Sequence, residues 1–493
     1  FQAEDGIRDV ERSRGLGDVY KRQDEIVKER LKKLAELRKR GIEPYAYSFD
    51  KKDFAEQLQQ TYKKLKPGRE TKKTAKIAGR VIVIRDLGKI IFVKLRDSSG
   101  DIQLILQNKK TPAKYIHFFK KFLDVGDFIG VTGKIMRTKR GELSIVVKNL
   151  TLLTKSILPL PEKWHGLKEE EERYRKRYLD ILMNPELREM FIKKSIFWQS
   201  IREFLLKKGF LEIETPVLEN TTGGADANPF KTHHDALDID VYLRISMGEL
   251  WQKRALIAGF EKVFEIGRQF RNEGISSEHL QDYTQMEFYW AYADYNDSMK
   301  LVEEMYKYVA KKTFGKLKFK IKNSVVDIGK KWKKIEYVKE IKKQTGVDVL
   351  KATKEEIIKK LKALNQEFDE KMEKERLIDV LWKYCRRNII GPAFIINHPL
   401  EVSPLAKINR KDKRLVERYI ILIGGTEVGN GYSELNDPLD QEKRFKRQQE
   451  LRKKGDKEAQ MYDKEYVEAL KYGMPPATGF GVSERLFSVL INK

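Results

Sequence analysis

Residues 264–290 read FEIGRQFRNEGISSEHLQDYTQMEFYW, and this stretch decides the fold. A hydrophobic strand leads into a loop that is dense in charge around Arg271, and a second strand returns from Tyr283. A period of two places Glu287 and Tyr289 on one face of that second strand. The opposite face would carry Met286, Phe288 and Trp290. The stretch therefore predicts two paired strands with a polar floor, an acid beside a phenol, opposite Arg271.

Two further segments are rich in glycine and carry polar candidates. Residues 423–434 read IGGTEVGNGYSE, in which Gly424-Gly425 is a typical two-residue hairpin turn. The glycines that follow allow backbone to approach a ligand closely. The side chains around that approach are Glu427, Asn430 and Glu434. Residues 473–485 read GMPPATGFGVSER, a loop that leads into a short helix with Arg485 in its first turn.

Nearer the N-terminus, the hydrophobic pattern is that of short strands separated by glycine turns. The predicted strands cover residues 81–84, 90–93, 102–106, 128–132 and 143–147. Five such strands are typical of a small barrel such as an OB-fold. Residues 24–160 hold 32 Lys and Arg against 15 Asp and Glu. A basic small barrel is a common reader of single-stranded nucleic acid, because its groove follows phosphates and its aromatic side chains stack on bases.

The composition agrees with a nucleic-acid partner. The chain has 493 residues, of which 40% are hydrophobic, and this suits two or three globular domains. Its formal net charge of +26 favours a polyanionic partner such as nucleic acid. A highly charged surface that only maintains solubility is the alternative explanation of the charge. Cys385 is the single cysteine, which excludes an intrachain disulfide and a cysteine-rich metal site. No apolar run reaches the roughly 20 residues of a membrane span, and no signal-peptide layout is present. We expect a cytoplasmic protein without a membrane span.

The predicted fold class is α+β with several domains. Residues 1–23 lack an amphipathic period and are interpreted as an appended, non-native segment. Residues 24–71 are predicted to form a helix and a linker, residues 72–156 the barrel, and residues 157–493 a mixed region that holds the chemistry. Within that region, residues 318–390 are predicted to be a helical insertion, with a capping box at Thr353 and Glu356.

The chain resembles the class II aminoacyl-tRNA synthetases, and among them the lysyl-tRNA synthetases. Residues 191–218 are similar to motif 1, residues 270–274 to motif 2 and residues 479–485 to motif 3. The lysine type is indicated by Gly223-Gly224, Gly248-Glu249-Leu250, Glu287-x-Tyr289 and the run from 429 to 437. The resemblance covers residues 25–493. It implies an OB-fold anticodon-binding barrel followed by a class II catalytic core, an antiparallel sheet flanked by helices, and a homodimer formed through motif 1.

The resemblance also implies residue roles. The implied lysine-binding residues are Gly224, Glu249, Glu287, Tyr289, Asn430 and Glu434. The implied ATP-binding residues are Arg271, Glu273, His279, Tyr283, Glu427 and Arg485, with Arg271, Glu273 and Arg485 as the catalytic group. Glu427 would hold Mg²⁺ with ATP. The implied anticodon-binding residues are Arg80, Phe92, Gln103 and Glu142. These residue types suit the chemistry, because two ammonium groups need carboxylates, and phosphates need arginines.

The implied function is a lysine–tRNA ligase acting on ATP, L-lysine and tRNA(Lys). The lysine carboxylate would attack the α-phosphate, and the adenylate would pass to the tRNA 3′ end, with the rate coming from positioning and charge neutralisation. An aspartate or asparagine enzyme is the alternative in the same class, but an aspartate side chain would meet the like charge of Glu434. A catalytically silent tRNA-binding protein is the alternative from another class, and the presence of Arg271, Glu273 and Arg485 argues against it.

Several positions depart from the family pattern. Leu280 stands where the family often has Asn, motif 3 is one residue shorter than usual, and eight residues follow Arg485 where relatives generally have more. Relatives usually carry an acid seven positions before Glu427, where this chain has Ile420. With a two-residue turn at 424–425, Leu422 would lie opposite Glu427 and Ile420 would be its diagonal neighbour. We therefore expect weaker magnesium binding than in relatives with both acids.

Overall fold

The protein is described by a computed structural model that covers residues 23–161, 170–274, 280–456 and 458–491. The chain forms two compact units, Phe1–Leu187 and Arg188–Lys493. The segment interpreted as appended lies outside the described residues except for Gln23, its last residue. The domain boundary at residue 157 stays a prediction.

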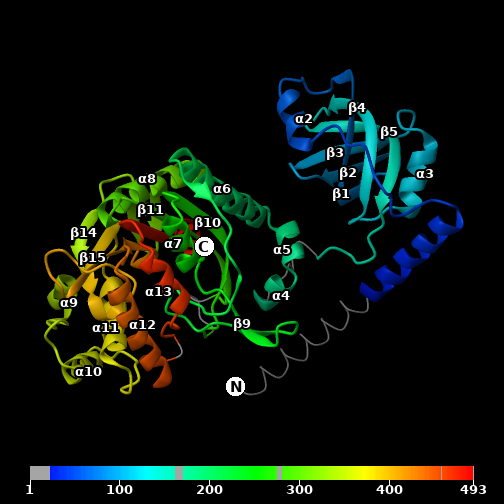
Figure 1. The fold of residues 1–493 in the computed structure, drawn as a ribbon. Coiled ribbons are helices and arrows are strands. Elements are labelled where there is room, and N and C mark those ends of the chain that lie inside the picture. The colour runs from blue at the N-terminus through cyan, green and yellow to red at the C-terminus, as the bar shows by residue number, and fades with distance from the viewer. Residues whose placement is uncertain (1–22, 162–169, 275–279, 457, 492–493) are drawn as a thin grey trace, which may run out of the picture. The chain divides into compact units, whose positions relative to one another are not determined.

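The first unit is built on a closed barrel of five strands in the order β1-β2-β3-β5-β4 (Figure 1). The strands are β1 (Glu70–Asp86), β2 (Ile90–Arg96), β3 (Asp101–Gln107), β4 (Phe128–Arg137) and β5 (Leu143–Thr154). A helix over residues 23–39 precedes the barrel. The other helices of this unit are α2 (Ala55–Thr61), α3 (Ala113–Phe122), α4 (Glu170–Arg175) and α5 (Arg177–Met183). The predicted barrel of five strands is confirmed.

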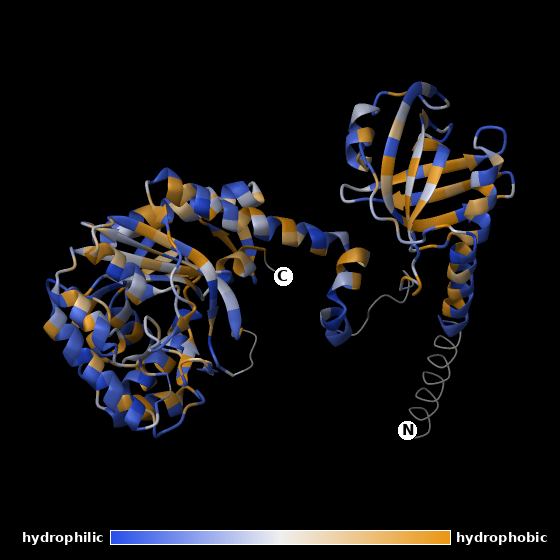
Figure 2. Ribbon diagram, turned by 45° about the vertical axis from the view of Figure 1, so that its right-hand side comes forward, coloured by the Kyte–Doolittle hydropathy of each residue, from blue (hydrophilic) through white to orange (hydrophobic). Residues whose placement is uncertain are grey.

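Alternation along the strands separates the inside of the barrel from its outside. In β2, Ile91, Val93 and Leu95 are buried in the barrel core, whereas Phe92 between Ile91 and Val93 is half-buried and lies outside that core. Figure 2 shows the same alternation of hydrophobic and hydrophilic residues along the barrel strands. A strand with one face in the core leaves every second side chain available on the outer surface.

The second unit is built on an eight-stranded sheet in the order β14-β15-β16-β17-β18-β11-β10-β6. Its pairs are antiparallel except β10 with β6 and β14 with β15. Its strands are β6 (Leu211–Glu212), β10 (Lys262–Phe270), β11 (Asp282–Ala291), β14 (Lys333–Glu336), β15 (Ala393–Pro399), β16 (Leu415–Ile423), β17 (Thr426–Ser433) and β18 (Ala477–Ser483). A small sheet of β7 (Leu218–Glu219), β9 (Ile239–Leu243) and β8 (Lys231–His234) accompanies it.

Helices cover the large sheet on both faces. On one face, α6 (Pro185–Lys207), α8 (Tyr295–Phe314) and α14 (Arg485–Ile491) pack against the sheet in the main hydrophobic core. On the other side, α7 (Glu249–Ile257), α12 (Pro438–Lys453) and α13 (Lys464–Lys471) enclose a second apolar cluster with β10 and β11. No helix in the described ranges is both long and apolar enough to cross a membrane. Because helices cover both of its faces, the large sheet is an internal layer, and its polar face packs against α7.

The segment predicted as a helical insertion begins with strands. Residues 318–336 form β12 (Lys318–Ile321), β13 (Ser324–Asp327) and β14, and the helices begin only at Tyr337. These helices are α9 (Tyr337–Thr345), α10 (Lys354–Ala363) and α11 (Lys374–Arg386). Beyond the segment, a short 3-10 helix, η1 (Leu400–Val402), follows β15. The predicted capping box at Thr353 and Glu356 is present. Phe319 and Ile321 alternate with lysines, a period of two that favours strand over helix.

The predicted hairpin turn at Gly424-Gly425 is confirmed. Both glycines have positive φ, 63° and 72°, as a two-residue turn that matches the strand twist requires. Leu422 pairs with Glu427 as expected. A bulge then shifts the register by one, so that Ile420 pairs with Asn430. The diagonal relation expected between Ile420 and Glu427 is therefore altered by the bulge.

Candidate active site

Strand β11 (Asp282–Ala291) supplies the floor of the candidate active site. Met286 and Phe288 are fully buried in the main core and Trp290 packs against it. Glu287 and Tyr289 point to the other face, and both are also buried, because helix α7 covers them. The predicted division of the strand into an apolar and a polar face is confirmed.

Glu287 is held by hydrogen bonds from three sides. Its Oε2 accepts from the Tyr289 hydroxyl at 3.1 Å, and its Oε1 accepts from Gln285 Nε2 at 2.5 Å and from the Met247 backbone at 3.2 Å. Burial raises the pKa of Glu287, and the nearby charge of Glu249 raises it further. The hydrogen bonds oppose this rise, and they fix the carboxylate in one orientation.

Two more buried carboxylates, Glu249 and Glu434, complete an acidic cluster. Glu249 is the first residue of α7, and Glu434 directly follows β17. Lys253, one helical turn after Glu249, lies between them: its Nζ is 2.6 Å from Glu249 Oε1 and 2.5 Å from Glu434 Oε2. Burial raises the pKa of Glu434, and the charge of Lys253 offsets part of that rise. We name Glu249, Glu287, Glu434 and Lys253 the acid cluster.

Gly224 closes the cluster from the loop before β8. Its φ is +86°, and a Cβ at this position would lie 2.6 Å from the Cβ of Glu249 and 2.6 Å from Ser246 Oγ. Any side chain here would displace Glu249. The structure thus brings together five of the six residues expected to bind lysine.

The sixth, Asn430, lies on the same sheet face two strands away. It pairs with Gly481 on β18, and Gly481 pairs on its other side with Glu287. The Asn430 side chain is engaged by Arg418, whose Nε donates to Asn430 Oδ1 at 2.9 Å. Asn430 therefore borders the acid cluster, and its amide oxygen, which can accept two hydrogen bonds, has one of them filled by Arg418.

Two arginines lie near Tyr283, which is on the same strand as Glu287. Arg271 follows β10, donates from Nε to the Ile245 carbonyl at 3.2 Å and holds its guanidinium 5.7 Å from the centre of the Tyr283 ring. Burial raises the pKa of Tyr283, whereas the charges of Arg271 and Arg485 lower it and that of Glu273 raises it. All three charged groups therefore lie near this phenol. A pair of guanidinium groups beside an aromatic ring suits a polyphosphate attached to a flat base.

His279 lies outside the described residues, so its predicted contact with ATP stays a prediction. Glu427 is described and lies on β17, with its Oε1 accepting from Trp382 Nε1 at 2.8 Å and lying 3.8 Å from Arg386 Nε. Ile420 is buried in the apolar cluster that α9, α10 and α11 form on β15 and β16. The structure thus gives Glu427 polar partners from helix α11 in place of a second acid.

A magnesium ion would find one carboxylate at this place. In the part of the chain that the structure describes, no group of three or more His, Cys, Asp or Glu side chains could hold a metal by itself. Mg²⁺ is commonly bound through one or two carboxylates together with substrate phosphates and water. The donor set fits a metal that arrives with ATP and is anchored by Glu427.

The four predicted anticodon-binding residues belong to the outer surface of the barrel. Phe92 on β2 and Gln103 on β3 are half-buried, and Gln103 Nε2 donates to Ser144 Oγ at 2.8 Å. Ser144 Oγ in turn donates to the backbone carbonyl of the exposed Glu142 at 3.2 Å. Arg80 on β1 donates to the Gly126 carbonyl at 3.0 Å and lies 4.2 Å from the centre of the Phe128 ring. An aromatic ring outside the core, with polar groups on adjacent strands, suits contact with an unstacked base.

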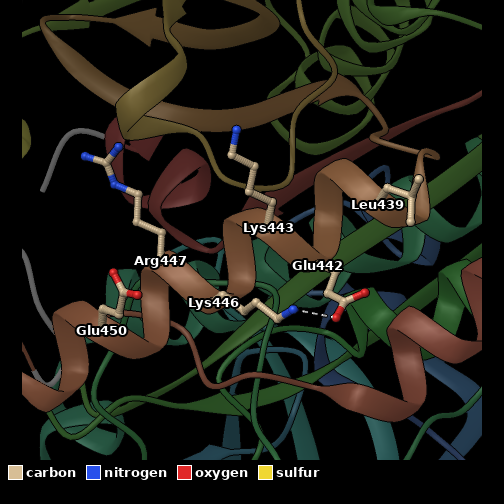
Figure 3. Close-up of a pocket in the computed structure, with 6 residues that line it drawn as sticks. All are labelled: Leu439, Glu442, Lys443, Lys446, Arg447 and Glu450. Carbon is tan, nitrogen blue, oxygen red and sulfur yellow. Dashed lines mark ion pairs between the residues drawn. The ribbon is translucent and has the colours of Figure 1, made fainter.

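A groove of about 450 Å³ lies along α12, and none of the predicted residues is among those that line it. Figure 3 shows its lining side chains on one side of the helix, with Lys446 turned toward Glu442. Those two form an ion pair of 2.8 Å, and Arg447 pairs with Glu375. Charged side chains that line this groove are paired with each other or with a neighbouring helix. The acid cluster therefore remains the candidate active site.

Sequence reasoning missed Lys253 and Tyr432. The Tyr432 hydroxyl donates to Glu249 Oε1, the same oxygen that Lys253 contacts. One signal was present: Glu249 and Lys253 are four residues apart, the spacing of an ion pair on a helix. Nothing in that spacing indicates that the pair is buried or that Glu434 joins it.

Comparison with known proteins shows which families the two parts of the chain match. A family model described as tRNA synthetases class II (D, K and N) matches residues 169–493, and one described as an OB-fold nucleic acid binding domain matches residues 75–153. A lysine–tRNA ligase of Thermotoga maritima is 45% identical over 466 residues, covering 94% of this chain and 92% of the relative. Those of Carboxydothermus hydrogenoformans and Thermosipho africanus are 44% and 42% identical, each over 95% of this chain and over 96% and 93% of their own lengths.

Proposed function

The chain belongs to the class II tRNA synthetases and is a lysine–tRNA ligase, and from this premise we propose how its residues carry out the reaction. The observation that carries the proposal is the acid cluster: three buried carboxylates from three separate parts of the fold converge beside a pair of arginines. A buried concentration of negative charge is costly unless cations balance it. A substrate with two ammonium groups supplies such cations.

The acid cluster is proposed to bind lysine through both of its amines. Glu249 and the backbone at Gly224 receive the α-amino group, while Glu434, Tyr289 and Asn430 surround the ε-ammonium group, with Glu287 beside them. Support comes from the burial of the three carboxylates and from Glu434 Oε1, which has no hydrogen-bond partner among the described residues. A buried, unpaired carboxylate oxygen is expected to gain strongly from an incoming ammonium group.

The arginine pair is proposed to bind ATP and to promote adenylate formation. Arg271 bridges the lysine carboxylate and the α-phosphate, Arg485 binds the γ-phosphate, and Glu273, His279 and Tyr283 surround the adenosine. A lysine carboxylate oxygen attacks the α-phosphorus, the bond to the β-phosphate breaks, and pyrophosphate leaves. The adenylate then passes lysine to the tRNA 3′ end and releases AMP. The arginines stabilise the charge that develops on the phosphate, and no covalent enzyme intermediate is needed.

ATP-dependent ligases of this family generally need Mg²⁺, and Glu427 is the residue proposed to hold it. When bound, the ion would neutralise charge on the ATP phosphates. Trp382 fixes one oxygen of Glu427, which orients the carboxylate for its task. The apolar Ile420 adds no ligand, so ATP phosphates and water are proposed to supply the remaining coordination.

The barrel is proposed to bind the anticodon of tRNA(Lys), with Phe92 stacking on a base and Arg80, Gln103 and Glu142 reading base edges. The half-buried ring outside the core supports this role. We infer a cytoplasmic site of action from the substrate, because charged tRNA serves the ribosome.

A homodimer is proposed through the motif 1 region. Helix α6 and strand β6 expose large apolar side chains: Phe191 is 44%, Ile192 50%, Leu206 50% and Leu211 48% exposed. Exposed apolar surface of this kind often marks a contact with another chain, and a two-fold contact would bury the same patch on both copies.

Lysine-dependent exchange of pyrophosphate into ATP tests the proposed chemistry directly. Exchange with lysine, and none with aspartate or asparagine, is expected. Exchange supported equally by aspartate would contradict the role of the acid cluster, and tRNA binding without any exchange would indicate a catalytically silent protein.

A further inference from the structure

Lys253 is a fully buried cation inside a site that is proposed to bind cations. Its side chain has no exposed surface, and Glu434, its partner, has none either. A lysine is almost never fully buried unless it is paired. The pairing here is double, because the ammonium group contacts one carboxylate from α7 and another from the end of β17.

The surroundings of Lys253 resemble a recognition site for an alkylammonium group. Besides the two carboxylates, the Nζ atom lies 5.7 Å from the centre of the Tyr289 ring and 5.4 Å from that of Tyr432. Both rings add cation–π attraction in a site closed to water. The protein's own lysine thus uses the groups that the substrate is proposed to use.

Contact with Lys253 does not use all the hydrogen-bonding capacity of Glu249 and Glu434. Lys253 contacts Oε1 of Glu249 and Oε2 of Glu434, and Glu434 Oε1 is left without a hydrogen bond among the described residues. A carboxylate can accept several hydrogen bonds at once. One ammonium group can therefore connect the two acids while each keeps an oxygen for the substrate.

We propose that Lys253 is a positioning residue for lysine recognition: its ammonium group connects Glu249 to Glu434 and so sets the distance between the carboxylates that receive the α-amino and ε-ammonium groups of the substrate. This inference rests on the proposed roles of Glu249 and Glu434. The distance between those carboxylates must match the length of the amino acid, so Lys253 also contributes to the choice of lysine over shorter diamino acids.

The charge balance of the site supports this role. The groups that face Lys253 are Glu249 on its own helix, Tyr289 from β11, Tyr432 from β17, Glu434, and Tyr466 from α13. Glu287 lies near the two carboxylates that Lys253 contacts. Burial by itself would lower the pKa of Lys253, but Glu249 and Glu434 outweigh it and hold that pKa above its ordinary value. Without this fixed cation, three neighbouring buried carboxylates would favour uptake of protons over binding of substrate.

The experiment replaces Lys253 by methionine, which keeps the length and apolar stem of the side chain but removes the charge. In the lysine-dependent exchange assay on the full chain, KM for lysine is expected to rise 10- to 100-fold, while KM for ATP changes less than twofold. The preference for lysine over ornithine, which is one methylene shorter, is expected to fall at least threefold. A purely structural ion pair would affect both substrates alike and leave this preference unchanged.

Lys155→Met is the matched control. Lys155 is also fully buried between two carboxylates, 2.5 Å from Asp124 Oδ2 and 2.8 Å from Asp127 Oδ2, but it belongs to the barrel unit. The lysine KM of this variant is expected to stay within twofold of the parent. If Lys253→Met does not fold, Lys253→Arg takes its place, because it keeps the charge but changes the size of the head group. The preference for lysine over ornithine is then expected to fall threefold.

Three results would overturn the proposal. An unchanged lysine KM together with an unchanged preference would remove Lys253 from recognition. A lower lysine KM in Lys253→Met would mean that Lys253 competes with the substrate for the carboxylates. Equal losses for lysine and ATP would indicate a general effect on folding. The Glu434→Gln variant distinguishes failure of this inference from failure of the proposed function. If Glu434→Gln leaves the KM for lysine unchanged, the proposed lysine site is refuted. If Glu434→Gln raises that KM and Lys253→Met does not, only the role of Lys253 is refuted.

Discussion

Replacing Glu434 by glutamine removes one negative charge from the acid cluster and leaves the side-chain volume almost unchanged. The side chain is fully buried, so its carboxylate and a bound ε-ammonium group would attract each other without screening by water. Truncating one member of a buried, hydrogen-bonded charge pair costs about 2–5 kcal/mol.

The structure favours the lower part of that range. The glutamine carbonyl still accepts one hydrogen bond, and Glu287 and Glu249 keep the pocket negative. We expect about 2–3 kcal/mol, which is roughly a 30- to 150-fold loss of kcat/KM for lysine. The loss should lie mainly in KM for lysine, because Arg271 and the ATP-binding groups are unchanged.

The assay is pyrophosphate exchange with lysine varied at saturating ATP and then with ATP varied at saturating lysine. Glu417→Gln is the matched control, since Glu417 is a buried glutamate of the same sheet that pairs with Arg410 and Ser433 instead of Lys253. The control should keep its lysine KM within twofold. An unchanged lysine KM and kcat in Glu434→Gln would refute the placement of the ε-ammonium group at Glu434.

Four further outcomes are expected. Phe92→Ala should weaken tRNA charging by about 1–3 kcal/mol, the usual size of a lost base stack, and leave exchange intact; equal damage to both reactions would make Phe92 a structural residue. Ile420→Glu should lower the magnesium concentration needed for half-maximal exchange at fixed ATP, and superimposable titrations would exclude position 420 from the metal site. The lysine KM should fall as pH rises from about 6 to 8.5, because burial raises the pKa of Glu287 and Glu434 and only the ionised carboxylates attract an ammonium group; a KM that is independent of pH would contradict this. Sedimentation at micromolar concentration should show a dimer, and Leu211→Arg should shift it toward the 57.9 kDa monomer; a parent protein that is monomeric throughout would disprove the dimer.

Local sequence determined the strands and turns. The alternation in residues 283–290 predicted which side chains of β11 enter the core and which form the floor, because a strand exposes its two faces strictly in turn. Gly424-Gly425 predicted the hairpin, since few other residues adopt positive φ twice in succession. The five barrel strands were predicted for the same local reasons.

Register and segment type were harder to predict where two local signals competed. The bulge between Ile421 and Leu422 places Ile420 opposite Asn430. The sequence pattern around the glycines of β17 does not indicate that a bulge occurs there. Residues 318–336 form strands although the lysine-rich composition of the whole insertion favoured a helix. The alternation at Phe319 and Ile321 was the better guide, because periodicity reports which side chains are buried and composition does not.

The sequence by itself supplied the candidate residues: the acids, the arginines and the glycines were found from their motifs, and the resemblance supplied the roles proposed for them. Only the tertiary structure decided how they act together. Glu249 and Glu434 are 185 positions apart, and they share the ammonium group of Lys253 only because α7 packs over β11 and β17 ends beside it. The burial that makes this contact strong is a property of the packed layers. A charge pair four residues apart on a helix has the same sequence pattern whether it lies in water, where it contributes little, or in a closed site, where it controls the charge of its neighbours.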